Sequence, residues 1–150
     1  MSRGSTPPPP SAFRQDGAMG DEAPVRVLVV DDQAPFRNAA RAVVDRLAGF
    51  EVVAEAESGE SAVTMAAAIT PDLILMDINM GGINGIEATR QIVGTTPDVM
   101  VVLLSTYELA DLPPEARTSG AAAYLAKDDF GSRTIRALWA TRGDPEFPLK

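Results

Sequence analysis

Short apolar runs alternate with stretches of helical periodicity along most of this chain, and that alternation limits the folds open to it. The apolar runs cover residues 25–30, 51–55, 73–76, 99–104 and 122–126. Three of these runs are apolar over their whole length, which is typical of strands that are buried on both faces. Strands that alternate with helices favour a parallel sheet with right-handed crossovers.

The predicted fold is therefore α/β, a flavodoxin-like (βα)5 doubly wound sandwich whose five parallel strands follow the order 2-1-3-4-5. Helical spacing of apolar residues predicts helices over 36–47, 58–69, from 85 onward and from 130 or 131 onward. Ser58 is expected to cap the second of these, and Pro35 suits the first turn of the first. Pro113 and Pro114 interrupt the segment 107–120, where we expect a late-starting, kinked or shortened helix.

The chain divides into one folded unit and two short ends. At 150 residues and 45% hydrophobic composition, it suits one domain with a substantial core, which we place at residues 25–142. Residues 1–24 are rich in Pro, Gly and Ser, so we predict a disordered arm whose four prolines at 7–10 form a semi-rigid spacer. Residues 143–150 form a short C-terminal tail.

Composition excludes several classes of function. With 13 basic and 21 acidic residues the formal charge is -8, which opposes nonspecific binding to nucleic acid or to an anionic membrane. No apolar run approaches the roughly 18 residues needed to span a bilayer, so a cytoplasmic protein is expected. The chain has neither Cys nor His, which excludes thiolate metal sites and the commonest general base. Oxygen ligands remain, and they point to Mg²⁺ or a similar hard cation.

Polar residues stand where four of the predicted strands end. Asp31 and Asp32 follow the first strand, Asp77 the third, Ser105 closes the fourth and Lys127 follows the fifth. Each alone would usually be a turn or capping residue. The carboxyl ends of parallel strands meet at one edge of the sheet, however, so we expect all of them in a single shallow cleft.

Electrostatics adds a requirement to this cleft. Two carboxylates about 4 Å apart repel each other by on the order of 4 kcal/mol at an effective dielectric constant near 20. Three of them need raised pKa values or a bound cation, and Mg²⁺ takes only one or two direct carboxylate ligands. Asp77 could then act as a nucleophile while it remains a ligand.

These motifs together resemble the receiver domain of two-component response regulators, over roughly residues 25–142. The matching segments read VLVVDD at 27–32, LILMDINM at 73–80, GIEATR at 85–90, LLST at 103–106 and GAAAYLAK at 120–127. The Lys127-Asp128 pair is similar to receivers of LuxR-type regulators. The resemblance implies a phosphoacceptor switch rather than an enzyme that turns over a substrate.

The resemblance also implies the site roles. Asp77 would take the phosphoryl group, with Lys127 balancing the charge on its oxygens. Mg²⁺ would be held by Asp32 directly, by Asp31 largely through water, by Asp77 and by the backbone carbonyl of Asn79. Ser105 would donate its hydroxyl to the attached phosphoryl group, and Tyr124 would rotate inward in response. The implied partners are a sensor histidine kinase or histidine phosphotransfer protein and a downstream protein target, with phosphorylation-dependent dimerisation left open.

Several alternatives stay open at this stage. The short tail favours a stand-alone receiver. One alternative is a receiver fragment of a DNA-binding transcription regulator, and another is a pseudo-receiver that acts without phosphorylation. A phosphohydrolase of the haloacid-dehalogenase type fits less well. Such enzymes have an Asp-x-Asp pattern at the nucleophile, whereas here Asn79 stands at the position of the second Asp. A dinucleotide-binding domain is rejected, because Asp31 and Asp32 replace the glycine-rich turn. Gly81-Gly82, where the family usually has Pro after Met80, is expected to loosen the loop beside the site.

Overall fold

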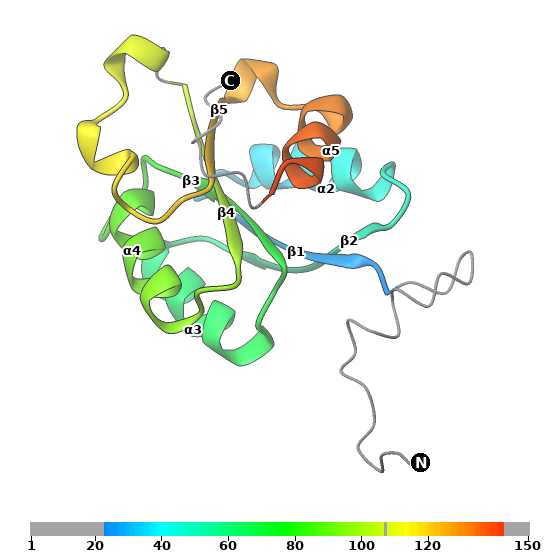
Figure 1. Ribbon diagram of the computed structural model, residues 1–150, viewed down its shortest axis with the longest axis horizontal. Coiled ribbons are helices and arrows are strands. Elements are labelled where there is room, and N and C mark those ends of the chain that lie inside the picture. The colour runs from blue at the N-terminus through cyan, green and yellow to red at the C-terminus, as the bar shows by residue number, and fades with distance from the viewer. Residues whose placement is uncertain (1–22, 107, 143–150) are drawn as a thin grey trace.

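The five predicted strands form one parallel sheet. The structure, a computed structural model, describes residues 23–106 and 108–142, so the predicted arm and tail lie almost wholly outside the described residues. The strands are β1 (Val25–Val30), β2 (Phe50–Ala56), β3 (Leu73–Asp77), β4 (Met100–Ser105) and β5 (Ala123–Ala126). Their order is β2-β1-β3-β4-β5, which confirms the predicted topology (Figure 1).

Among the described residues, four α-helices cover the two faces of this sheet. They are α2 (Ala34–Asp45), α3 (Gly59–Ile69), α4 (Gly85–Thr95) and α5 (Ser132–Ala140). Helices α3 and α4 lie on one face, and α2 and α5 lie on the other (Figure 1). Each face has its own buried core, which is why the central strands are apolar on both sides. No helix of the described part has both the length and the apolar character to cross a bilayer.

The helices begin at the capping residues and the proline that the sequence indicates. The Ser58 side chain accepts a hydrogen bond from the backbone N–H of Ser61 at 3.0 Å, as predicted for a cap. Pro35 lies in the first turn of α2, where its missing N–H costs nothing. Asn84 caps α4 in the same manner, because its side-chain oxygen accepts from the N–H of Glu87 at 2.9 Å.

The segment between β4 and β5 differs from the sequence expectation. We predicted a late-starting, kinked or shortened helix, but the described residues there form only two 3-10 helices, Leu109–Asp111 and Pro114–Ala116. Pro113 and Pro114 each lack a backbone N–H, so neither can donate an i→i−4 bond, and their rings exclude continuation of a preceding helix. The buried side chain of Ala116 fastens the second turn to the core.

The loop between β3 and α4 is held to the adjoining helix. Gly82 has a φ of +76°, a conformation that favours glycine. The carboxylate of Glu60, in the first turn of α3, accepts a hydrogen bond from the backbone N–H of Ile83 at 3.1 Å. The expected loosening by Gly81-Gly82 is therefore countered by an anchor to α3.

Gly85 brings the start of α4 against the end of β3. Its N–H donates to the carbonyl of Ile78 at 2.9 Å, and a Cβ at this position would overlap the backbone carbonyl of Asp77. At Gly94, near the other end of the same helix, a Cβ would meet no atom within 4 Å apart from its chain neighbours and the backbone of its own helix. The two glycines thus differ in the space around them.

We expect Gly85→Ala to destabilise the fold by about 1–3 kcal/mol, because the strand that carries Asp77 must shift to admit the methyl group. Gly94→Ala is the matched control, and it should leave stability unchanged or raise it by up to about 1 kcal/mol through helix propensity. Urea unfolding monitored by circular dichroism measures both. Equal stabilities of the two variants would contradict the close packing of Gly85 on Asp77.

Candidate functional site

The predicted polar residues do converge at the carboxyl edge of the sheet. Asp31 directly follows β1, Asp77 is the last residue of β3, and Ser105 is the last residue of β4. Lys127 follows β5 and begins a short 3-10 helix, Lys127–Asp129. Strand register explains the convergence, because Asp77 pairs with Leu104 and Ser105 with Ala126 across adjacent parallel strands.

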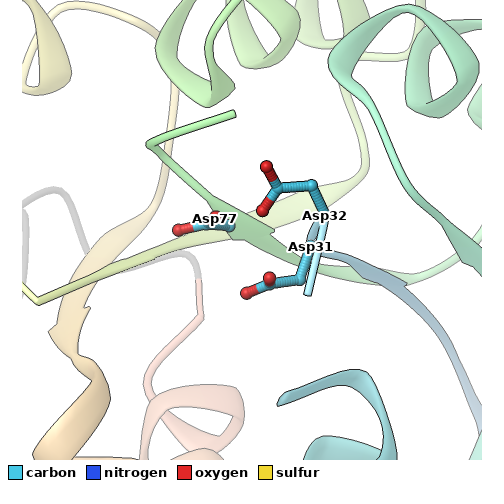
Figure 2. Close-up of side chains that lie close together, drawn as sticks. All are labelled: Asp31, Asp32 and Asp77. Atoms are coloured by element: carbon cyan, nitrogen blue, oxygen red, sulfur yellow. The ribbon is translucent and has the colours of Figure 1, made fainter. Parts of the chain in front are cut away.

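Three carboxylates form the centre of the site. Asp31, Asp32 and Asp77 each offer an oxygen, and these oxygens lie within 4.8 Å of one another. Figure 2 shows the three side chains grouped together, with Asp31 and Asp32 reaching in from the end of β1 and Asp77 from β3. Asp31 and Asp77 are buried, whereas Asp32 is exposed. The group therefore has two buried acids and one that is open to solvent.

Lys127 supplies positive charge to the two buried acids. Its ammonium lies 2.7 Å from Oδ2 of Asp31 and 3.5 Å from Oδ1 of Asp77. The same ammonium lies 4.4 Å from the centroid of the Phe36 ring, a cation–π contact. Phe36 in turn packs on Phe130 with ring centroids 5.5 Å apart. The ammonium is thus held by one acid, one ring and, more loosely, the second acid.

The pKa of Asp77 is raised to about 6. Burial is the largest cause, because it disfavours the charged carboxylate, and the neighbouring Asp31 carboxylate raises the pKa further. Lys127 acts in the opposite direction through its charge and a hydrogen bond, as does a backbone hydrogen bond from Asn79. One lysine is insufficient to offset the burial of two acids, so Asp77 takes up a proton at a higher pH than an ordinary aspartate.

The remaining predicted residues connect this centre to the sheet. The side-chain amide of Asn79 donates to the hydroxyl of Ser105 at 3.5 Å, a long contact. The hydroxyl of Tyr124 donates to the backbone carbonyl of Ser105 at 3.4 Å, and the Tyr124 side chain is fully buried. Tyr124 is thus buried beside the end of β4, and its rotation in response to phosphorylation stays a prediction.

Two contributors to the site were not identified from the sequence. Apolar spacing alone assigns Phe36 to the buried face of the helix predicted over 36–47, although its place four residues after Asp32 puts it beside the acids once a helix begins at Ala34. Arg37 was not singled out, yet its guanidinium donates to the backbone carbonyl of Asp31 at 2.7 Å. An arginine in the first turn after an acid pair is the signal that could have revealed it.

The donor set suits a hard divalent cation. Every candidate ligand is an oxygen, and two of the three acids are buried where an uncompensated charge is costly. The raised pKa of Asp77 is the expected sign of carboxylates that lack a sufficient counter-charge. The residues present therefore fit a cation such as Mg²⁺, whereas the absence of His and Cys from the chain disfavours zinc.

Comparison with known proteins agrees with this geometry. A family model described as "Response regulator receiver domain" matches residues 27–138. The transcriptional regulatory protein DegU of Brevibacillus brevis is 36% identical over 118 residues, which are 79% of this chain and 50% of DegU. The response regulator GacA of Pseudomonas protegens is 40% identical over 114 residues, 76% of this chain and 54% of GacA. The chain thus spans about half the length of these relatives.

Solved structures give the same fold. The response regulator domain of Thermotoga maritima CheB is 32% identical, with a TM-score of 0.70 over 81% of this chain and 99% of that one. The signal receiver domain of the putative response regulator NarL from Mycobacterium tuberculosis is 28% identical, with a TM-score of 0.73 over 79% of this chain and 95% of that one. The residues matched by the family model, 27–138, run from within β1 into α5 and include the three carboxylates at the edge of the sheet.

We expect Asp77 to make the metal-free fold less stable as the pH rises. Its folded pKa, about 6, lies above the ordinary aspartate value, so between these two values the folded state binds the proton and the unfolded state does not. Stability is lost through that window and stays low above it. Asp77→Asn removes the burial cost and should stabilise the chain at pH 7.5 by on the order of 1–2 kcal/mol, but not at pH 4.

Urea unfolding of both proteins at the two pH values, in chelator, measures this difference. Asp45→Asn is the control, because Asp45 is an exposed acid on α2. A stability gain in Asp77→Asn that is the same at pH 4 and pH 7.5 would show that the charge on Asp77 is not the cause.

Proposed function

We propose, on the premise that this chain belongs to the response regulator receiver domain family, that Asp77 accepts a phosphoryl group from a phosphohistidine on a partner protein. A carboxylate oxygen of Asp77 forms a bond to phosphorus, the bond between phosphorus and the donor imidazole nitrogen breaks, and the nitrogen keeps the electron pair. The product is an acyl phosphate. The chain contains no His, so it acts as acceptor and not as phosphohistidine donor.

The observation that carries this proposal is the position of the Asp77 carboxylate, which lies 3.5 Å from the Lys127 ammonium and close to two further acids. Phosphoryl transfer requires positioning and stabilisation of charge more than covalent assistance. Lys127 would contact the phosphoryl oxygens after it exchanges its contact with Asp31. The Ser105 hydroxyl, at the end of the adjacent strand, would donate to the same oxygens.

Mg²⁺ is the cation that we assign to the site. Asp31, Asp32, Asp77 and the backbone carbonyl of Asn79 would hold it, with Asp31 acting largely through water. When bound, the ion neutralises carboxylate charge and stabilises the negative charge of the phosphoryl group. The exposed carboxylate of Asp32 is accessible to a hydrated ion, and this exposure supports a direct contact there.

The output would pass through Ser105 and Tyr124. A phosphoryl dianion on Asp77 attracts the Ser105 hydroxyl, and the carbonyl of the same residue already accepts a hydrogen bond from Tyr124. A displacement of Ser105 would therefore also displace the buried Tyr124 side chain and the surface next to it. Couplings of this kind are typically about 1–3 kcal/mol. We assign the chain to a cytoplasmic phosphorelay with a sensor histidine kinase or phosphotransfer protein upstream and a protein target downstream.

A second candidate function places the same switch inside a longer transcription regulator. DegU is named a transcriptional regulatory protein, and this chain matches only 50% of its length. The Lys127-Asp128 pair, which resembles LuxR-type receivers, supports the same assignment. In that case the phosphorylated receiver would control a DNA-binding domain, and the chemistry at Asp77 would be unchanged.

Acetyl phosphate with Mg²⁺ should add one acid-labile phosphoryl group to this chain, detectable by intact-mass measurement. Asp77→Asn should abolish the adduct, because an amide oxygen is too weak a nucleophile, whereas the control Asp45→Asn should retain it. An adduct that persists in Asp77→Asn would exclude Asp77 as acceptor. No adduct in the parent chain would favour a pseudo-receiver, and steady hydrolysis of a generic phosphate ester would favour a phosphohydrolase.

A further inference from the structure

The guanidinium of Arg37 ties the loop that carries the acid pair to the edge strand of the sheet. Its Nη1 donates to the backbone carbonyl of Asp31 at 2.7 Å, and its Nε donates to Oε1 of Glu55 at 3.1 Å. The side chain is only 13% exposed, so both contacts lie largely out of solvent. A planar guanidinium can serve two such acceptors at once because its donors point in fixed directions.

Glu55 is itself fixed in place. It lies in β2, and its second oxygen, Oε2, accepts from Nε of Arg41 at 2.8 Å. The hydrogen bond from Arg41 is the largest influence that lowers the pKa of Glu55, and Arg37 lowers it further. Glu55 therefore carries its charge, holds Arg37 on one side and is held by Arg41 on the other.

The loop between β1 and α2 is fixed at further points. The N–H of Asp31 donates to the carbonyl of Ala56 at 3.1 Å, and the N–H of Gln33 donates to Oδ1 of Asp31 at 2.8 Å. Arg37 adds the bond to the Asp31 carbonyl, which belongs to the peptide unit that joins Asp31 to Asp32. The orientation of this peptide unit sets where the Asp32 side chain leaves the backbone.

We propose that Arg37, held by Glu55, is a positioning residue that sets the affinity of the acid pair for Mg²⁺. This inference rests on the proposed function of the same site. Among the described residues, Arg37 bonds to Glu55 and to the backbone carbonyl of Asp31 but to no carboxylate of the cluster, so it would act through that carbonyl. Glu55, which it shares with Arg41, offsets part of its charge and so limits the repulsion between the Arg37 guanidinium and the cation. Partners that orient metal ligands typically affect affinity about 10–100-fold.

Arg41 provides a matched control. Like Arg37 it lies on α2 and forms an ion pair with Glu55, at 2.7 Å between Nη2 and Oε2. Within the described part of the chain, Arg41 bonds to Glu55 and not to Asp31. Arg37→Gln and Arg41→Gln therefore each remove one ion pair with Glu55, but only the first removes the bond to the acid-bearing loop.

The experiment measures Mg²⁺ binding by isothermal titration calorimetry to the parent chain, Arg37→Gln, Arg41→Gln and Arg37→Lys. We expect Arg37→Gln to raise the Kd roughly tenfold. Arg41→Gln should stay within about twofold of the parent, even where urea unfolding shows that both variants lose similar stability. Arg37→Lys should fall between them, because one ammonium serves both acceptors less well than a guanidinium.

Phosphorylation by acetyl phosphate over a range of Mg²⁺ concentrations gives a second readout. In Arg37→Gln the Mg²⁺ concentration for half-maximal rate should rise with the Kd, while the rate at saturating Mg²⁺ stays within about twofold. Equal Kd values in Arg37→Gln and Arg41→Gln, with a parent chain that binds Mg²⁺ and is phosphorylated, would overturn the role of Arg37 alone. A parent chain that neither binds Mg²⁺ nor is phosphorylated would overturn the proposed function and this inference together.

Discussion

Three carboxylates crowded at one edge of a parallel sheet form the constraint to which the rest of the site responds. Parallel strands bring their carboxyl ends to the same edge, so Asp31 and Asp77 become neighbours as soon as β1 pairs with β3. Burial then makes their charges costly, and Lys127 compensates for only part of this cost. The result is a site with an excess of negative charge, which a divalent cation would offset.

The acids are held from both faces of the sheet. On one face, α4 begins at Gly85, whose missing side chain lets the helix approach the carbonyl of Asp77. On the other, the first turn of α2 contributes the Phe36 ring against Lys127 and the Arg37 guanidinium against the Asp31 carbonyl. Each contact comes from the start of a helix, where the chain has just left the sheet edge. The order of the strands brings the site residues to one edge, and the first turns of α2 and α4 then fix their positions.

The sequence predicted what depends on periodicity and chain order. The strand order, the Ser58 cap and the meeting of Asp31, Asp77, Ser105 and Lys127 all follow from apolar runs that end in polar residues on parallel strands. It did not predict contacts that depend on where a long side chain turns, such as the guanidinium of Arg37 reaching both Asp31 and Glu55. The sequence prediction also overestimated the helix content of the segment after β4. Two adjacent prolines there leave only two 3-10 helices among the described residues.

The segment between β4 and β5 bears on how the proposed switch would act. The chain that follows Ser105 forms two 3-10 helices of three residues each, which have few internal hydrogen bonds to resist displacement. Tyr124, by contrast, is fully buried and is bonded to the Ser105 carbonyl. On the proposed function, a pull on Ser105 would meet Tyr124, a buried partner on β5, and the two short 3-10 helices after β4, of which Ala116 fastens the second to the core. Because local stability decides which element moves, we expect these short helices to respond to a charge added at Asp77 before Tyr124 does.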